Sequence, residues 1–284
     1  MQYLKKEIEL DYARLEINPP KDKVYLECYI LDKSLDIEMN QPENKRPAIL
    51  VLPGGGYHMT SKREGEPIAL QFLAAGYSVF KLDYSVAPDA FFPCSLFQVY
   101  TAIKMIRDNA DKWAVDCDKI AVCGFSAGGH LTASCGAFWD RDFVKDAGFS
   151  DDKHKPNALV LCYPVISGGT NRQPGSYKNL LGTENPSDSD LKYHSIELQV
   201  TESFPRSFIW HTFTDPVVPV QNSLLLASAM ADKGIMFEMH IYPEGNHGLA
   251  LSNRFTSKAG TQPPEKPRAW VKDCIKFLNE NAYN

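Results

Sequence analysis

One serine stands in a setting that can turn a hydroxyl group into a nucleophile. Ser126 is the central residue of Gly124-Phe125-Ser126-Ala127-Gly128, which fits the pattern Gly-x-Ser-x-Gly. An apolar run before it predicts a strand, and the small residues after it predict a helix, so the serine falls on a sharp turn that exposes its oxygen. The residues two before and two after must be small because the turn brings them together. A glycine-rich helix start, capped by the serine, is the alternative interpretation.

A serine hydroxyl is a weak nucleophile and needs a base, which a third group must orient. On a strand–turn–helix of this kind the partners follow in the order serine, acid, histidine. Asp215 comes directly after the apolar run 206–213, and His247 follows the next such run, 236–243. Both lie in turn-rich segments past strand ends, where open α/β sheets form their active sites. We therefore predict Asp215 and His247 as partners of Ser126; Asp83 comes too early in the chain, and Glu244 is a weaker rival.

His247 is the only histidine that is both flanked by glycines and placed after the last strand; the six others are His58, His130, His154, His194, His211 and His240. His130 lies one helical turn beyond Ser126 and cannot turn back to the hydroxyl, so we interpret it as a packing or capping residue. His211 and His240 fall inside predicted strands and are interpreted as core or sheet-face residues. His58 follows three glycines and is a candidate for contact with substrate.

Acyl transfer passes through an oxyanion that backbone N–H groups must stabilise. The N–H of Ala127, next to the serine at the start of a helix, is one expected donor. The segment 52–58 is expected to supply the second, because its three successive glycines let the backbone approach a ligand closely. A flexible turn is the alternative for this segment. A phosphate-binding loop is disfavoured, since the glycines have neither the spacing nor the lysine that such loops carry.

The rest of the chain predicts the scaffold that positions these groups. The first 40 residues alternate apolar and polar side chains, which indicates one or two antiparallel strands. After them, continuous apolar runs alternate with amphipathic segments, which is typical of a mostly parallel, doubly wound α/β sheet with helices on both faces. We expect strands at 46–52, 78–84, 119–125, 157–166, 206–213 and 236–243. We expect helices at 66–77, 94–113, 126–139, 220–234 and 267–282.

Residues 167–205 depart from this alternation, because turn-forming residues are frequent and periodicity is weak. A segment of this length between two strands is typical of a lid or a substrate-binding insertion. We treat it as an insertion within a single domain that spans residues 1–284.

Composition excludes several other classes of function. The net charge of −5 and the lack of a Lys/Arg-rich run argue against a nucleic-acid partner. No apolar run approaches the length of a membrane span, and the first residues do not form a signal peptide, so we expect a cytoplasmic protein. The seven cysteines are scattered, with no Cys-x-x-Cys pair, and are expected to be reduced.

Five motifs occur in order along the chain: PGGGY at 53–57, LDYSVAP at 82–88, GFSAGGHL at 124–131, TDPVVP at 214–219 and GNHG at 245–248. Together they resemble the α/β-hydrolase superfamily, in its esterase/lipase branch related to hormone-sensitive lipases and bacterial carbohydrate acetyl esterases. The resemblance extends from about Arg46 to the C-terminus. It implies the α/β-hydrolase fold and the Ser126, Asp215 and His247 triad.

The same resemblance implies Gly55, Gly56 and Ala127 as oxyanion donors, with no metal and no cofactor. The family often has a histidine before the three glycines, where this chain has Pro53. That histidine is usually structural, so the oxyanion hole is expected to persist. Which glycine donates is left open, as is a homodimer.

The resemblance favours a small acyl group, and acetyl above all, on a small-molecule ester such as an acetylated xylo-oligosaccharide. Tyr57, His58 and Arg63 are the candidate substrate contacts. The insertion adds polar and aromatic groups that suit a sugar ester: Asn171, Arg172, Tyr177 and Asn179. Two other functions stay open: a serine peptidase of the prolyl-oligopeptidase type, and a hydrolase-fold protein that only binds a ligand.

Overall fold

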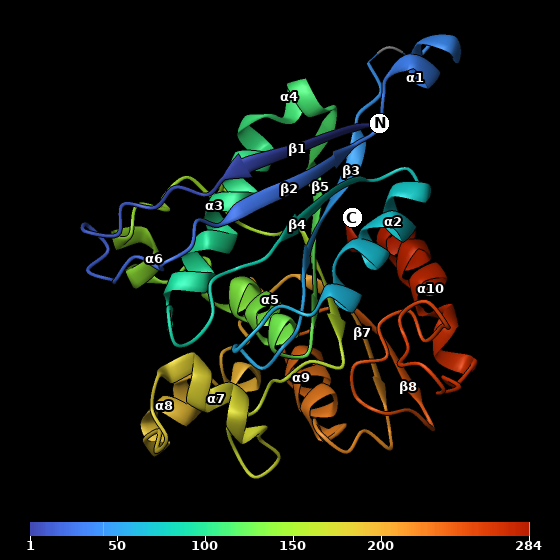
Figure 1. Cartoon of the computed structure of the whole chain (residues 1–284). Coiled ribbons are helices and arrows are strands. Elements are labelled where there is room, and N and C mark those ends of the chain that lie inside the picture. The colour runs from blue at the N-terminus through green and yellow to red at the C-terminus, as the bar shows by residue number, and fades with distance from the viewer. Residues whose placement is uncertain (42, 284) are drawn as a thin grey trace.

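The computed structural model describes residues 1–41 and 43–283, and its centre is an eight-stranded sheet (Figure 1). In spatial order its strands are β1 (Gln2–Glu7), β2 (Tyr25–Ile30), β4 (Ser78–Leu82), β3 (Arg46–Leu52), β5 (Val115–Phe125), β6 (Ala158–Cys162), β7 (Arg206–Thr212) and β8 (Phe237–Tyr242). The pairings β1–β2 and β2–β4 are antiparallel, and all the others are parallel. The predicted fold class is confirmed.

Helices cover both faces of this sheet. The helices are α1 (Ser34–Glu38), α2 (Glu66–Ala74), α3 (Cys94–Asp108), α4 (Ala110–Trp113), α5 (Ala127–Phe138), α6 (Asp142–Asp146), α7 (Pro174–Leu181), α8 (Asp188–Tyr193), α9 (Gln221–Asp232) and α10 (Trp270–Phe277). Short 3₁₀ turns, η1 (Lys62–Glu64), η2 (Ile196–Leu198) and η3 (Lys266–Ala269), and one π turn, η4 (Leu278–Ala282), complete the chain. The helix expected over 94–113 is interrupted at Asn109, after which α4 forms a separate turn.

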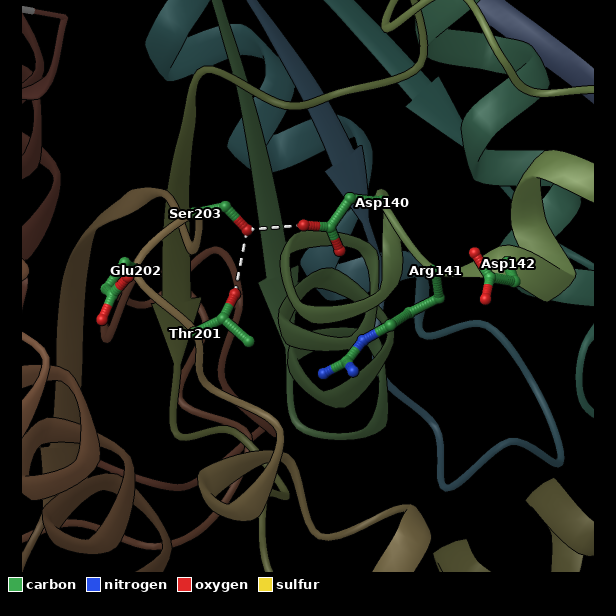
Figure 2. Close-up of a pocket in the computed structure, with 6 residues that line it drawn as sticks. All are labelled: Asp140, Arg141, Asp142, Thr201, Glu202 and Ser203. Carbon is green, nitrogen blue, oxygen red and sulfur yellow. Dashed lines mark hydrogen bonds between the residues drawn. The ribbon is translucent and has the colours of Figure 1, made fainter.

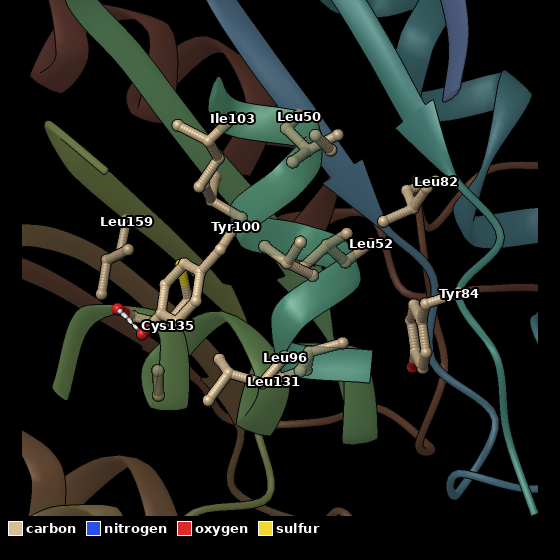
Figure 3. Close-up of a cluster of buried hydrophobic side chains, with 14 of the residues drawn as sticks. Leu50, Leu52, Leu82, Tyr84, Leu96, Tyr100, Ile103, Leu131, Cys135 and Leu159 are labelled. Atoms are coloured by element: carbon tan, nitrogen blue, oxygen red, sulfur yellow. Dashed lines mark hydrogen bonds between the residues drawn. The ribbon is translucent and has the colours of Figure 1, made fainter. Parts of the chain in front are cut away.

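Two hydrophobic cores hold the helices to the sheet. On one face, α2 and α10 meet through Phe72 and Trp270, whose ring centroids are 6.4 Å apart. On the other face α3 and α5 pack against the leucines of β3 and β4, as Figure 3 shows for Leu50, Leu52 and Leu82, and α9 packs against β7 and β8. The central strands are buried on both sides, which explains their continuous apolar runs.

Residues 167–205 form α7, α8 and η2, which gather beside α9 at one end of the molecule (Figure 1). The segment is fixed to the main domain from within: Tyr177 Oη donates to the carbonyl oxygens of Ile166 and His194, at 3.0 and 3.1 Å. Its predicted role as a lid or substrate-binding insertion stays a prediction. Over residues 1–41 and 43–283, every helix is too short or too polar to cross a membrane.

Candidate active site

Ser126 occupies the turn between β5 and α5. Its backbone angles, φ 53° and ψ −116°, are strained for a residue with a side chain. The end of β6 and the segment after it hold Ser126 there, because its N–H donates to the carbonyl oxygen of Cys162 at 3.0 Å and its own carbonyl accepts from the N–H of Val165 at 3.1 Å. The side chain is thereby presented at the carboxyl end of the sheet.

The glycines on either side of the serine are required by space. A Cβ on Gly124 would lie 2.1 Å from the carbonyl oxygen of Gly128 and 2.2 Å from Thr132 Oγ1. A Cβ on Gly128 would lie 2.3 Å from the carbonyl oxygen of Leu52, at the end of β3. The turn therefore brings β5, α5 and β3 into direct backbone contact, as the Gly-x-Ser-x-Gly pattern predicts.

Asp215 and His247 meet Ser126 from the loops that follow β7 and β8. Ser126 Oγ lies 2.7 Å from His247 Nε2, and His247 Nδ1 lies 2.6 Å from Asp215 Oδ2. The Asp215 side chain is fully buried, whereas the side chain of His247 keeps 15% of its surface exposed. The three groups form a continuous relay in which the imidazole can take the serine proton while the carboxylate holds its other nitrogen.

Asp215 is held as an ionised acceptor. Its Oδ1 accepts from the N–H groups of Val217 and Val218, at 2.9 and 3.0 Å. Burial alone would raise the pKa of this carboxyl group, but hydrogen bonds from His211 and His247 outweigh burial and hold the pKa well below its usual range.

His211 is a site residue that the sequence interpretation did not include. We expected a core residue, and it is fully buried, but its Nε2 lies 3.4 Å from Asp215 Oδ2 while donating to the carbonyl oxygen of Val218 at 2.9 Å. Its Nδ1 contacts Ser223 Oγ at 2.8 Å. In the sequence, only the spacing of four residues between His211 and Asp215 hints that the two side chains could meet. This spacing predicts a contact only once the end of β7 has been located between them.

The glycine loop after β3 forms the opposite wall. The N–H of Gly54 is engaged, because it donates to Glu64 Oε2 at 2.9 Å. Among residues 1–41 and 43–283, the N–H groups of Gly55, Gly56 and Ala127 have no acceptor. Gly55 has φ 135° and Gly56 has φ 63°, backbone angles that residues with side chains rarely adopt. The N–H groups of the three predicted residues are thus free to donate, whereas that of Gly54 is already engaged.

Ser126, His247 and the glycine loop line a cavity of about 300 Å³. Its walls are formed by Gly55, Gly56, Met59, Ser61, Arg63, Glu64, Ser126, Gln173, Ser176, Val217, His247 and Gly248. Gln173 and Ser176 come from the start of α7, so the insertion contributes to the wall. Asn179, also from α7, donates to the carbonyl oxygen of Gly56 at 2.8 Å and so holds the glycine loop.

Of the three residues predicted to contact substrate, one lines the cavity in the structure and two do not. Arg63 lines the cavity, and it donates to the carbonyl oxygen of Thr256 in a long hydrogen bond of 3.4 Å. The prediction that Tyr57 contacts substrate was wrong. Its backbone angle, φ 56°, turns the side chain away from the cavity and into the core, where its hydroxyl donates to His130 Nδ1 at 2.9 Å. His58 is exposed and lies outside the residues that line the cavity.

A second pocket of about 500 Å³ lies between the end of α5 and the residues that precede β7 (Figure 2). Asp140 Oδ2 there accepts from Ser203 Oγ at 2.8 Å, and Ser203 Oγ also bonds to Thr201 Oγ1 at 2.9 Å. Ser126 precedes the first residue of α5, a helix of 12 residues, so this pocket lies about 18 Å from the nucleophile. In the described part of the chain, His, Cys, Asp and Glu side chains form no group of three or more that could bind a metal ion.

Comparison with known proteins gives consistent matches. The family model BD-FAE matches residues 35–230. An endo-1,4-beta-xylanase B from Butyrivibrio fibrisolvens is 38% identical over 76% of this chain and 34% of its own length. An acetylxylan esterase from Xylanibacter ruminicola is 30% identical over 75% of this chain and 43% of its own. The chain therefore spans less than half of the length of these curated relatives.

A solved structure matches over nearly the whole chain. It is an acetyl ester-xyloside bifunctional hydrolase from Caldicellulosiruptor lactoaceticus, 34% identical, with a TM-score of 0.80. The match covers 97% of this chain and 95% of that protein.

Proposed function

Because this chain belongs to the BD-FAE family of α/β-hydrolase esterases, we propose that it is a serine carboxylic ester hydrolase that removes small acyl groups, chiefly acetyl, from sugars such as xylo-oligosaccharides. The observation that carries this proposal is the relay from Ser126 Oγ through His247 to Asp215, with contacts of 2.7 and 2.6 Å.

In the proposed reaction, Ser126 Oγ attacks the ester carbonyl carbon while His247 Nε2 takes the hydroxyl proton. Asp215 stabilises the imidazolium that forms, and the N–H groups of Ala127 and of Gly55 or Gly56 receive the oxyanion. His247 then passes the proton to the leaving alcohol, which leaves an acyl group on Ser126. Water, activated by the same histidine, attacks this acyl-enzyme and regenerates the serine.

The small cavity and the polar side chains in its wall support the small-acyl, sugar-ester substrate. A volume of about 300 Å³ is at the low end for ligand sites. The side chains of Ser61, Arg63, Gln173 and Ser176 offer hydrogen-bonding groups suited to sugar hydroxyls. Two of the matched relatives have names that include an acetyl ester or acetylxylan, which favours acetylated xylo-oligosaccharides. A cytoplasmic location and the absence of a cofactor are part of the same proposal.

The test is a panel of acetylated xylo-oligosaccharides and p-nitrophenyl esters of increasing acyl length, with an aminoacyl-proline amide as the peptidase substrate. We expect acetate esters to be hydrolysed fastest, and Ser126→Ala to lose at least 1000-fold in kcat/KM. Ser203→Ala, in the second pocket, is the matched control and is expected to keep full activity. Preference for octanoyl esters or for the amide would overturn the substrate class, and full activity of Ser126→Ala would overturn the mechanism.

A further inference from the structure

Glu64 is a buried carboxylate in the wall of the proposed active site, and the reaction as written does not use it. It is the last residue of η1, and only 3% of its surface is exposed. Its two oxygens accept from different parts of the chain: Oε2 from the N–H of Gly54 at 2.9 Å, and Oε1 from the hydroxyl of Tyr163 at 2.7 Å. A carboxylate is the side chain that can accept from two converging donors at once.

Tyr163 carries this connection to the histidine. It directly follows β6, and its hydroxyl oxygen accepts from the N–H of Ala250, in the loop that carries His247, at 3.0 Å. The rings of Tyr163 and His247 lie edge to face with centroids 5.1 Å apart. A chain of hydrogen bonds therefore runs from the glycine loop through Glu64 and Tyr163 to the histidine loop.

Glu64 is closely packed against the glycine loop. A Cβ on Gly54 would lie 2.7 Å from Glu64 Oε2 and 2.9 Å from Ser126 Cβ, so the loop backbone at Gly54 lies against both the carboxylate and the nucleophile residue. Within the described residues, Glu64 joins no ion pair. Burying a carboxylate without a basic partner costs free energy, which only well-made hydrogen bonds offset.

We propose that Glu64 is a positioning residue that fixes the oxyanion loop relative to His247, an inference that rests on the proposed esterase function. By engaging the N–H of Gly54, it determines the orientation of the next peptide groups, whose N–H donors must meet the oxyanion. Through Tyr163, the same carboxylate fixes the distance between these donors and the general base. The donors act on the transition state and hardly at all on the bound ester.

The experiment measures kcat and KM for p-nitrophenyl acetate in the intact protein. We expect Glu64→Ala to lower kcat about 100-fold, with KM changed less than about three-fold, since loss of an oxyanion donor costs 10²–10³ in kcat. Glu64→Gln keeps an acceptor for Gly54 and can donate to Tyr163, so it should recover most of that loss. Glu66→Gln removes an exposed carboxylate two residues away and is the matched control, expected to stay within two-fold of the parent.

Two further measurements separate positioning from loss of structure. Titration with a fluorophosphonate probe counts competent sites, so that kcat refers to folded protein only. In a double-mutant cycle, Tyr163→Phe added to Glu64→Ala should cost less than three-fold more, because both changes cut the same connection. If Glu64→Ala does not fold, Glu64→Gln and Tyr163→Phe take its place, with expected losses in kcat of about three- to five-fold and about three- to thirty-fold, respectively.

Each outcome has a distinct meaning. Unchanged kcat in these variants, a loss confined to KM, or fully additive losses would overturn the positioning role while leaving a Ser126-dependent esterase in place. A parent protein without esterase activity would instead overturn the proposed function.

Discussion

Replacement of Asp215 by asparagine tests whether the relay works as its geometry implies. Asp215 Oδ1 accepts from two backbone N–H groups, those of Val217 and Val218. The oxygen of an asparagine must take that place, which turns its NH₂ group toward His247 Nδ1. The imidazole then has to accept at Nδ1 and carry its proton on Nε2, where it faces Ser126 Oγ and cannot take the serine proton.

The expected loss follows from two contributions. The first contribution is the lost attraction between the carboxylate and the imidazolium. This attraction amounts to roughly 4 kcal/mol for unit charges about 4 Å apart at an effective dielectric constant of about 20. The wrong tautomer adds to this loss, and the known behaviour of such triads sets the total near 10⁴-fold, or about 5.5 kcal/mol. We therefore expect Asp215→Asn to lower kcat/KM for p-nitrophenyl acetate between 10³- and 10⁴-fold.

Steady-state kinetics at pH 7.5 would measure this effect, with thermal unfolding to show that the fold is intact. Asp232→Asn, an exposed change at the end of α9, is the matched control and should stay within two-fold of the parent. A well-folded Asp215→Asn that keeps more than a tenth of the activity would refute the reasoning, because His247 would then be oriented by some other group.

Three further outcomes follow from the structure. Gly124→Ala places a methyl group 2.1 Å from a backbone oxygen, so thermal unfolding should show a loss of at least about 3 kcal/mol, whereas Gly175→Ala, with 3.4 Å of room, should be nearly neutral. Burial lowers the pKa of His130 to about 4, and its unfolded value is near 6.5, so protonation of this group alone should remove about 3 kcal/mol from the free energy of unfolding as the pH drops from 7 to 4. Urea titrations should therefore show a smaller drop over this pH range in His130→Gln than in the parent, and an equal drop would contradict this. Arg63→Ala should raise KM for acetylated xylo-oligosaccharides about five-fold but leave p-nitrophenyl acetate unaffected, and an equal effect on both substrates would exclude a sugar contact.

Much of this architecture could be predicted from the sequence because each prediction depended on a local pattern with a strong physical cause. Continuous apolar runs predicted the parallel strands, and strand ends predicted where polar residues would meet. Asp215 and His247 are 32 residues apart but follow adjacent strands, so one rule about sheet edges was enough to bring them together. Gly124 was predictable for a steric reason that needs no knowledge of the rest of the fold.

Other features depended on contacts that no local pattern encodes. Tyr57 follows three glycines and was predicted to contact substrate, but the backbone angle at that residue, φ 56°, sends its ring into the core. His211 was placed correctly in a buried strand, yet its approach to Asp215 depends on the turn after β7. The helices of residues 167–205 are short, and their apolar side chains pack on the main domain, so they show little periodicity of their own.

Glu64 shows why charge in a sequence is a poor guide to its use. The charges of the stretch Lys62-Arg63-Glu64-Gly65-Glu66 fit either a segment at the mouth of the site or an ordinary solvated loop, and Arg63 and Glu66 are exposed. Of the four side chains in this stretch, Glu64 is the one that accepts from two donors within the described residues, because it lies between the N–H of Gly54 and the hydroxyl of Tyr163, which directly follows β6. The carboxylate is thus selected by the meeting of three distant segments, and the same meeting sets the distance between the oxyanion donors and the base. The side chain of Glu64 must therefore have its full length to reach both donors. Glu64→Asp retains the carboxylate but withdraws it by one methylene, so its loss in kcat should be closer to that of Glu64→Ala than to that of Glu64→Gln.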